Sequence, residues 1–427
     1  MIKYTWILIL LLLLSGCQTG EEKLNQQEKK VKENIQQPTP SVVELEDKRE
    51  KKSEEETVSE DLDEATLLEM SIDEIMSNMS LEAKVAQMFY VTLEDYESTG
   101  LSYGGIIFFK HNMITAIETQ NIIRKIQSEL DIPAFIGLDE EGGLVTRITG
   151  EASIGGTKIP DAWVLGHATN PNAVYLANEI IAKEIRSLGF NMNFAPVGDI
   201  HTNPSNPIIG HRAFSDNPHI VGEKVIEALK AYQEHEIIPV IKHYPGHGDT
   251  KEDSHLGTAI LSHDIERLMS VELVPFIEAI RDGVDVIMVG HLQVPQVTGD
   301  TTPASLSEMM IQEILIRELG FKGLVISDAL NMKSIVDYYG TELMIDLGLD
   351  AGLSLFLMPE DVDNAYEYLL KKARTSIETE IKIEEAVRKI IRLKLEKNLF
   401  EYKNQVLQDP IIGQIEDRNI IAELEIE

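Results

Sequence analysis

Only one of the 427 residues is a cysteine, only 6% are aromatic, and the 38 basic residues are far outnumbered by 72 acidic ones. A lone cysteine cannot form an intrachain disulfide, so the fold does not depend on disulfide cross-links. The formal net charge of -34 repels phosphate backbones, which excludes nucleic acid as an expected partner. After the first twenty residues, no apolar run is long enough to cross a bilayer.

The amino terminus has the pattern of an export signal. Lys3 precedes an apolar run at residues 6–14 that is too short for an ordinary spanning helix, which predicts a signal peptide over residues 1–16. The sequence Leu-Ser-Gly-Cys at residues 14–17 resembles the lipobox of bacterial lipoproteins, and Cys17 is the only cysteine. That resemblance implies acylation of Cys17 and anchoring to the extracytoplasmic face of the cell membrane. The alternative is an accidental apolar segment with a buried free thiol.

Residues 17–68 are expected to form a linker. From residue 18 to 68 there is no aromatic residue, and Glu, Lys, Gln and Ser dominate, so apolar burial cannot offset the entropy of ordering. A disordered tether of this length reaches about 40 Å as a flexible coil. Exposed helix over parts of the segment is the alternative.

Residues 69–400 show short apolar runs that alternate with amphipathic stretches, as expected of parallel strands joined by helices. The eight predicted strands are residues 85–91, 105–109, 134–138, 191–196, 238–242, 284–289, 323–327 and 354–358. The predicted helices include residues 114–130, 173–188, 220–235, 265–282, 306–319 and a closing helix at 383–399. The pattern predicts an α/β fold, a single (β/α)8 TIM barrel, followed by an acidic tail at 401–427. An open doubly wound sheet is the alternative, but no glycine-rich phosphate fingerprint follows the first strand.

Polar residues stand where the predicted strands end, which is where a barrel of this kind carries its active site. They are Asp139, Asp199, Lys242, His243, His291 and Asp328. The loop after the fifth strand adds His247, Asp253 and His255. Because Asp253 and His255 are two residues apart, the carboxylate can accept a hydrogen bond from one imidazole nitrogen, which favours the protonated ring and suits a general acid.

Residues 242–255, Lys-His-Tyr-Pro-Gly-His-Gly-Asp-Thr-Lys-Glu-Asp-Ser-His, closely resemble the signature of the bacterial exo-β-N-acetylglucosaminidases (beta-hexosaminidases) of glycoside hydrolase family 3. Similarity extends to Leu-Asp-Glu-Glu-Gly-Gly at 138–143 with Arg147, and to residues 193–199, 210–215 and 325–330. In order and spacing these segments span nearly the whole predicted barrel.

The resemblance implies roles for individual residues. Asp328 matches the nucleophile, His255 the acid/base and Asp253 its orienting partner. The residues that match those holding the terminal N-acetylglucosamine are Asp139, Arg147, Arg212, Lys242 and His243. It further implies a retaining mechanism through a glycosyl-aspartate, an N-acetylglucosamine oligosaccharide or muropeptide as substrate, and no metal or cofactor. The sequence identifies no protein partner.

The chain departs from the family where Leu144 stands in place of a common arginine. Two other functions stay open at this point. His243, His247, Asp253 and His255 could instead ligate a metal in a metal-dependent hydrolase. The pocket could also serve a sugar-binding lipoprotein without turnover, because a fold alone never establishes catalysis.

Overall fold

The computed structural model describes residues 63–149, 154–251, 257 and 259–402. The predicted signal peptide, most of the predicted linker, nearly all of the acidic tail and three named residues, Cys17, Asp253 and His255, lie outside the described residues. Within the described part of the chain, no helix is both long and apolar enough to span a membrane.

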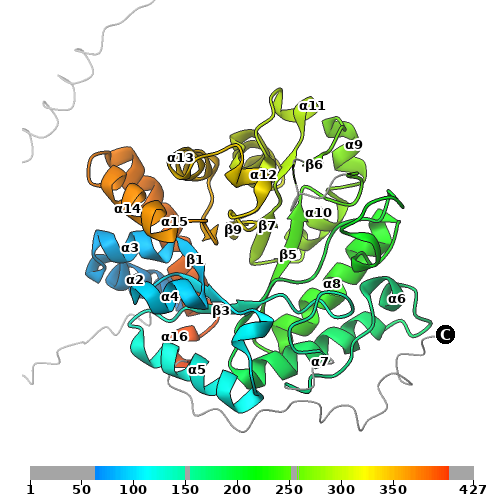
Figure 1. Ribbon diagram of the computed structural model, residues 1–427, viewed down its shortest axis with the longest axis horizontal. Helices are drawn as coiled ribbons and strands as arrows, with labels where there is room; N and C mark the ends of the chain where they lie inside the picture. Colours follow the sequence, from blue (N-terminus) through cyan, green and yellow to red (C-terminus); the bar gives the residue numbers. More distant parts are fainter. Residues whose placement is uncertain (1–62, 150–153, 252–256, 258, 403–427) are drawn as a thin grey trace, which may run out of the picture. The chain divides into compact units, whose positions relative to one another are not determined.

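Eight parallel strands form the centre of the fold, as predicted (Figure 1). They are β1 (Phe89–Thr92), β2 (Gly105–Ile107), β3 (Phe135–Leu138), β4 (Met192–Asn193), β5 (Ile238–Tyr244), β7 (Val286–Val289), β9 (Leu324–Ser327) and β10 (Phe356–Leu357). They pair in the order β10-β1-β2-β3-β4-β5-β7-β9, and a parallel bridge between Ile326 and Leu355 joins β9 to the start of β10. The ring therefore closes, which confirms the (β/α)8 barrel.

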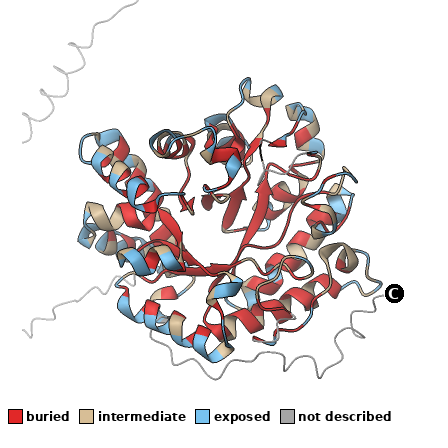
Figure 2. Ribbon diagram, in the orientation of Figure 1, coloured by how far each residue is buried: buried red, intermediate tan, exposed pale blue. Residues whose placement is uncertain are grey.

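Helices surround this ring and separate its strands in sequence (Figure 1). The longer ones are α2 (Glu64–Asn78), α5 (Ala116–Glu129), α7 (Ala173–Leu188), α8 (Pro218–Glu234), η4 (Met309–Glu318), α13 (Thr341–Ala351), α14 (Val362–Ala373) and α15 (Ile377–Glu396). Shorter ones are α3 (Leu81–Gln87), α4 (Leu93–Thr99), α6 (Ala162–Gly166), α11 (Pro295–Thr298), α12 (Lys333–Val336) and α16 (Leu399–Tyr402). Figure 2 shows the strands buried and the helices buried on the faces that meet them. This is the pattern of a parallel barrel covered on its outside.

Among the sequence-derived boundaries that differ from the structure, three concern a helix start or a helix break. The predicted helix at 265–282 is two helices, α9 (Ile265–Ser270) and α10 (Val274–Arg281), because Pro275 lacks the amide hydrogen that would continue the first one. The predicted strand 85–91 begins too early, since residues up to 87 complete α3, which is capped by the Ser80 hydroxyl. The helix α2 starts at Glu64, capped by Asp63, so the expected linker boundary at 68 falls inside a helix.

Large apolar side chains fill the barrel interior, including Tyr90, Phe135 and Phe194. The helix α15 contributes Ile390 and Leu393 to the same cluster. Since the interior is packed with side chains, the space for a ligand is left to the loops that follow the carboxyl ends of the strands.

Candidate active site

A cavity of about 500 Å³ lies among these loops and has a volume typical of small-molecule sites. Its wall contains every predicted site residue that the structure describes: Asp139, Arg147, Arg212, Lys242, His243 and Asp328. Asp139 follows β3, Lys242 and His243 lie near the end of β5, and Asp328 follows β9. Tertiary structure thus brings together residues separated by up to 189 positions in sequence (139 to 328).

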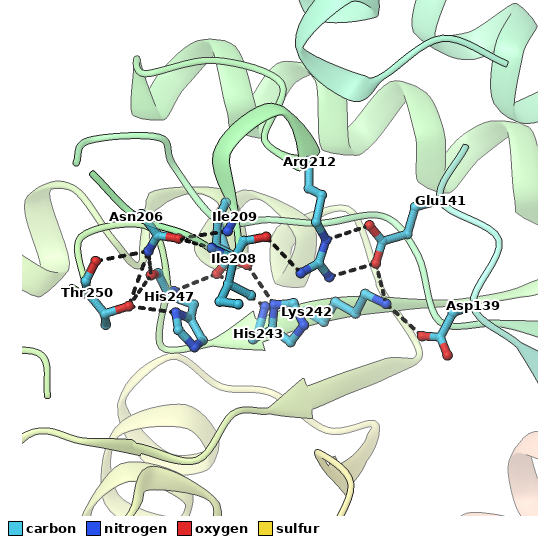
Figure 3. A network of polar contacts seen from close by, with 11 residues as sticks. Asp139, Glu141, Asn206, Ile208, Ile209, Arg212, Lys242, His243, His247 and Thr250 are labelled. Atoms are coloured by element: carbon cyan, nitrogen blue, oxygen red, sulfur yellow. Dashed lines mark hydrogen bonds and ion pairs between the residues drawn. The ribbon is translucent and has the colours of Figure 1, made fainter. Parts of the chain in front are cut away.

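Ion pairs link most of these side chains into one network (Figure 3). The Lys242 Nζ lies 2.8 Å from Asp139 Oδ1 and 2.6 Å from Glu141 Oε1. Arg212 donates to both oxygens of Glu141, at 2.9 and 2.8 Å, in the bidentate geometry that makes such pairs strong. Arg147 Nη2 donates to the other oxygen of Asp139 at 3.1 Å. Three cations and two carboxylates therefore hold one another in place.

Two effects shift the pKa values in this network in opposite directions. Burial favours the neutral forms, attraction between opposite charges favours the charged forms, and the attraction is the larger effect. Burial raises the pKa of Glu141, but the neighbouring Arg212 and Lys242 outweigh it and hold that pKa well below its usual range. Burial lowers the pKa of Lys242, yet Asp139 and Glu141 leave it raised. Glu141 and Lys242 therefore both stay charged at neutral pH. Charged donors and acceptors of this kind make the stronger hydrogen bonds to sugar hydroxyls.

Glu140 is fully buried and organises the loop that carries Arg147. One of its oxygens accepts the backbone N–H of Arg147 at 2.6 Å and of Ile148 at 2.8 Å, and the other accepts the Thr146 hydroxyl at 2.6 Å. Burial raises the pKa of Glu140, and these hydrogen bonds oppose that effect. The Glu140 carboxyl group thus accepts the backbone N–H groups of Arg147 and Ile148 in place of backbone carbonyls, and it thereby fixes the conformation of the loop.

Asp199, fully buried after β4, organises the end of β5. Its Oδ2 accepts the Nδ1–H of His243 at 2.7 Å, and its Oδ1 accepts the backbone N–H of His247 at 2.6 Å. Burial raises the pKa of Asp199, but His243 and His247 outweigh it and leave the pKa lowered. The bond fixes the tautomer and orientation of His243, whose ring is part of the cavity wall.

A second group of polar contacts lies next to His243, around the loop that follows β5 (Figure 3). His247 is buried, and burial lowers its pKa, which favours the neutral ring. Its Nδ1 lies 2.8 Å from the Thr250 hydroxyl, and Asn206 donates to the backbone oxygen of His247 at 2.9 Å. The described part of this loop is therefore a fixed structure.

Asp328 is partly buried at the cavity wall, directly after β9. Its backbone N–H donates to Val289 at 2.9 Å, and its Oδ1 accepts the N–H of Ala329 at 2.8 Å. The buried His291 donates from Nε2 to the Ala329 oxygen at 3.0 Å, while its Nδ1 accepts the Ser305 hydroxyl at 2.7 Å. His291 thus holds the carbonyl oxygen of Ala329, the residue whose backbone N–H binds the Asp328 carboxylate.

With this geometry established, comparison with known proteins identifies the family. The model of the glycosyl hydrolase family 3 N terminal domain matches residues 80–393, which is most of the chain and the whole barrel from α3 to α15. The protein belongs to glycosyl hydrolase family 3.

Individual family 3 relatives are moderately similar. Beta-hexosaminidase A of Pseudoalteromonas piscicida is 33% identical over 285 residues, covering 61% of this chain and 46% of that protein, so the chain matches under half of that relative. A beta-hexosaminidase of Stenotrophomonas maltophilia is 34% identical over 269 residues, covering 61% of this chain and 78% of that protein. The solved β-N-acetylglucosaminidase of Paenibacillus sp. str. FPU-7 superposes with a TM-score of 0.75 at 32% identity, covering 81% and 68% of the two chains.

The sequence assignments left out Glu141, Asp199 and Glu140, which hold the assigned residues of this family 3 site in place. Glu141 could have been found, because residues two apart in an extended segment project to the same side, and Asp139 was already assigned. Asp199 stands at the end of a predicted strand, but the sequence alone gives it no role. Nothing in the sequence distinguishes the inward orientation of Glu140.

One group in the described part of the chain has the residue types of a metal site: Asp249, His263 and Glu272, whose ligand atoms lie within 4.8 Å of one another. His263 Nε2 lies 2.6 Å from Asp249 Oδ2, and Arg267 donates to both oxygens of Glu272 at 2.9 to 3.2 Å. A divalent cation there would lie beside the Arg267 guanidinium. The contacts fit a hydrogen-bonded ion-pair cluster better than a metal centre.

Proposed function

We propose that this protein is a retaining exo-β-N-acetylglucosaminidase that removes terminal, non-reducing β-linked N-acetylglucosamine. The observation that carries the proposal is the single cavity in which Asp328 faces the ion-pair network of Asp139, Glu141 and Lys242. The names of the similar family 3 proteins support the same activity.

In the first step, the Asp328 carboxylate attacks the anomeric carbon while the bond to the leaving-group oxygen breaks. His255, oriented by Asp253, gives its proton to that oxygen. In the second step the neutral imidazole takes a proton from water, the water oxygen attacks the anomeric carbon, and Asp328 is released. Two inversions retain the configuration. The roles of Asp253 and His255 rest on the family resemblance, because both lie outside the described residues.

The sugar is held by groups whose charges are already balanced by neighbours. Arg147 and Lys242 share Asp139, and His243 is fixed by Asp199, so each can direct a remaining donor or lone pair at a hydroxyl without rearranging. Such preorganisation lowers the entropic cost of holding the ring close to the nucleophile.

The experiment that tests this function is covalent trapping. Treatment with a 2-acetamido-5-fluoro glycosyl inhibitor, followed by peptide mass spectrometry, is expected to place the label on Asp328. The variant Asp328→Asn keeps the acceptor for Ala329 but should lose at least about 10³-fold in kcat, since it removes the nucleophile. A label on another residue, or binding of an aryl β-N-acetylglucosaminide without release of the aglycone, would refute the assignment.

We propose further that the natural substrates are peptidoglycan fragments and that Cys17 is acylated and anchors the protein to the outer face of the cell membrane. A lipid on Cys17 would place the enzyme on the side of the membrane where cell-wall glycans occur. In cells expressing Cys17→Ser, the protein should move from the membrane fraction to the soluble fraction, while kcat/KM on an aryl substrate stays unchanged. Retention of the variant in the membrane would contradict the lipid anchor.

A further inference from the structure

Asp249 and His263 form a hydrogen-bonded pair outside the network already described. The His263 Nε2–H donates to Asp249 Oδ2 at 2.6 Å. Asp253 and His255, which carry proton transfer by the family resemblance, lie between these two residues in sequence. We call residues 250–262 the acid/base segment. The pair therefore joins the two ends of the segment that contains both proposed proton-transfer groups.

The first end of the acid/base segment is held by the segment after β4. Asn203 donates from Nδ2 to the Thr250 backbone oxygen at 2.9 Å. Asn206 donates to the same oxygen at 3.1 Å, and the Thr250 side chain is buried beside it (Figure 3). Asp249 therefore directly precedes a residue whose backbone is fixed.

The other end is held by a short parallel pairing of β6 (Ala259–Ile260) with β8 (Leu292–Gln293). The Leu261 N–H continues this pairing by donating to the Gln293 oxygen at 2.9 Å, and the Leu261 side chain is fully buried. The strand β8 directly follows His291, which lies on the nucleophile's side of the site. His263 thus follows a backbone that is fixed to that side.

Glu272, between α9 and α10, supports the pair. Its carboxylate is buried, with Oε1 3.9 Å from His263 Nε2, and Arg267 donates to the same oxygen at 2.9 Å. Glu272 also packs against the turn after β5, where Gly246 has φ of +126° and a β-carbon would lie 3.0 Å from the Glu272 β-carbon. The cluster of Asp249, His263, Arg267 and Glu272 therefore contacts both ends of the acid/base segment and the end of β5.

The pair is too exposed to contribute much to overall stability. The side chains of Asp249 and His263 are 27% and 23% accessible, so solvent screens their attraction. Joining the ends of a segment nevertheless reduces the number of conformations open to it. Small displacements of a catalytic group are costly in rate, so such a restriction affects catalysis more than folding.

We propose that Asp249 and His263 are positioning residues for general acid/base catalysis. Their hydrogen bond sets the separation between the ends of the acid/base segment and so limits where the proton donor lies relative to Asp328. Neither residue lines the described wall of the active-site cavity, so neither acts on the sugar directly. The inference rests on the proposed glycosidase function, because it assumes that the acid/base group lies between them in the chain.

Two aryl β-N-acetylglucosaminides separate proton donation from the rest of the reaction. A 2,4-dinitrophenolate leaves without being protonated, whereas a 4-methylphenolate needs the general acid. For both substrates kcat/KM reports the first step, in which the glycosyl-enzyme forms. In His263→Ala, kcat/KM on the 4-methylphenyl substrate should fall about tenfold, while kcat/KM on the dinitrophenyl substrate should change by less than about twofold. Asp249→Ala should give the same result.

Combining the substitutions tests whether the two residues act as one pair. On the 4-methylphenyl substrate the double variant should lose about tenfold, as each single variant does, and not the product of about a hundredfold. His263→Gln, whose amide N–H can replace the imidazole donor, should recover most of the loss.

His235→Ala is the matched control. His235 Nε2 lies 3.2 Å from Glu179 Oε1, and the two side chains are 26% and 23% accessible, close to the values of the proposed pair. His235 ends α8 just before β5 begins, so it lies at the opposite end of that strand from Lys242 and His243. The ratio of kcat/KM on the two substrates should be unchanged in this variant.

The positioning role is refuted if His263→Ala and Asp249→Ala lower kcat/KM equally on both substrates or leave both unchanged. It is also refuted if the losses of the single variants multiply in the double variant. Because either single variant tests the ratio by itself, failure of one of them to fold still leaves a decisive measurement. A wild-type protein that cleaves neither substrate would instead refute the proposed function.

Discussion

Glu141 shows how one buried carboxylate holds the site together. It accepts two hydrogen bonds from Arg212 and one ion pair from Lys242, with its side chain only 6% exposed. Burying two cations without a partner is far more costly than burying the complete network, because the charges lose water and gain nothing in return. Glu141 therefore serves both the stability of the barrel rim and the orientation of Lys242.

Replacing Glu141 by Gln should lower the free energy of unfolding by about 3–5 kcal/mol, the usual cost of breaking a buried ion pair. Denaturant unfolding at pH 7 measures the loss. Glu313→Gln breaks the exposed pair with Arg317 and is the control, for which no loss should be resolved. Equal losses in both variants would show that the Glu141 network contributes no more than a surface pair.

The stability difference between wild type and Glu141→Gln should also depend on pH. Since the pKa of folded Glu141 is held below its unfolded value, its charge stabilises the protein above the unfolded pKa of about 4.3, and this stabilisation is lost as pH falls through the lower folded pKa. The difference in unfolding free energy between wild type and Glu141→Gln should therefore narrow as pH drops below about 4.3. A difference that stays constant down to the acid limit would contradict the lowered pKa.

At the scale of elements, the loop after β5 depends on close contact with the segment after β4. Gly248 lies so near this segment that a β-carbon would stand 1.7 Å from the Ile200 backbone oxygen. Asp199, in the same segment, holds His243 and His247. Separating the two segments would therefore disturb the active-site histidines together with the backbone.

Gly248→Ala should destabilise the protein by about 1–3 kcal/mol, as overpacking usually does. Its kcat/KM on an aryl β-N-acetylglucosaminide should fall at least about tenfold, since small misplacements of catalytic groups are costly. Gly257→Ala is the control in the same loop, because none of the residues that the structure describes lies within 4 Å of a β-carbon built there. If the two variants behave alike, the contact between the segments does not position the site.

At the scale of the whole molecule, one lysine is buried at the base of the barrel. Lys394, on α15, is fully buried, donates to Gln87 Oε1 at 2.6 Å and lies 4.8 Å from the Phe135 ring centre. Burial lowers its pKa well below the usual value, so the folded state favours a neutral amine. The unfolded chain keeps this lysine charged up to a pH of about 10.4.

Folding then releases a proton, and stability must rise with pH. Between pH 8 and 10, wild type should gain up to about 1.4 kcal/mol per pH unit relative to Lys394→Met, which cannot titrate. Denaturant unfolding of both proteins at several pH values measures this difference. A flat difference would mean that Lys394 remains charged in the folded protein.

The sequence by itself was sufficient to predict the eight strands, the barrel and the family, because alternating runs of apolar residues and a long motif are local features. It also named six residues that line one cavity. It failed to predict the break at Pro275 and the inward orientation of Glu140 and Glu141. Packing decides the two orientations. Arg212 and Lys242, distant in sequence, compensate the burial of Glu141, and the Thr146 hydroxyl with the N–H groups of Arg147 and Ile148 compensates that of Glu140. The hollow of about 800 Å³ beside Leu144 likewise exists only where the segment after β3 meets the segment after β4.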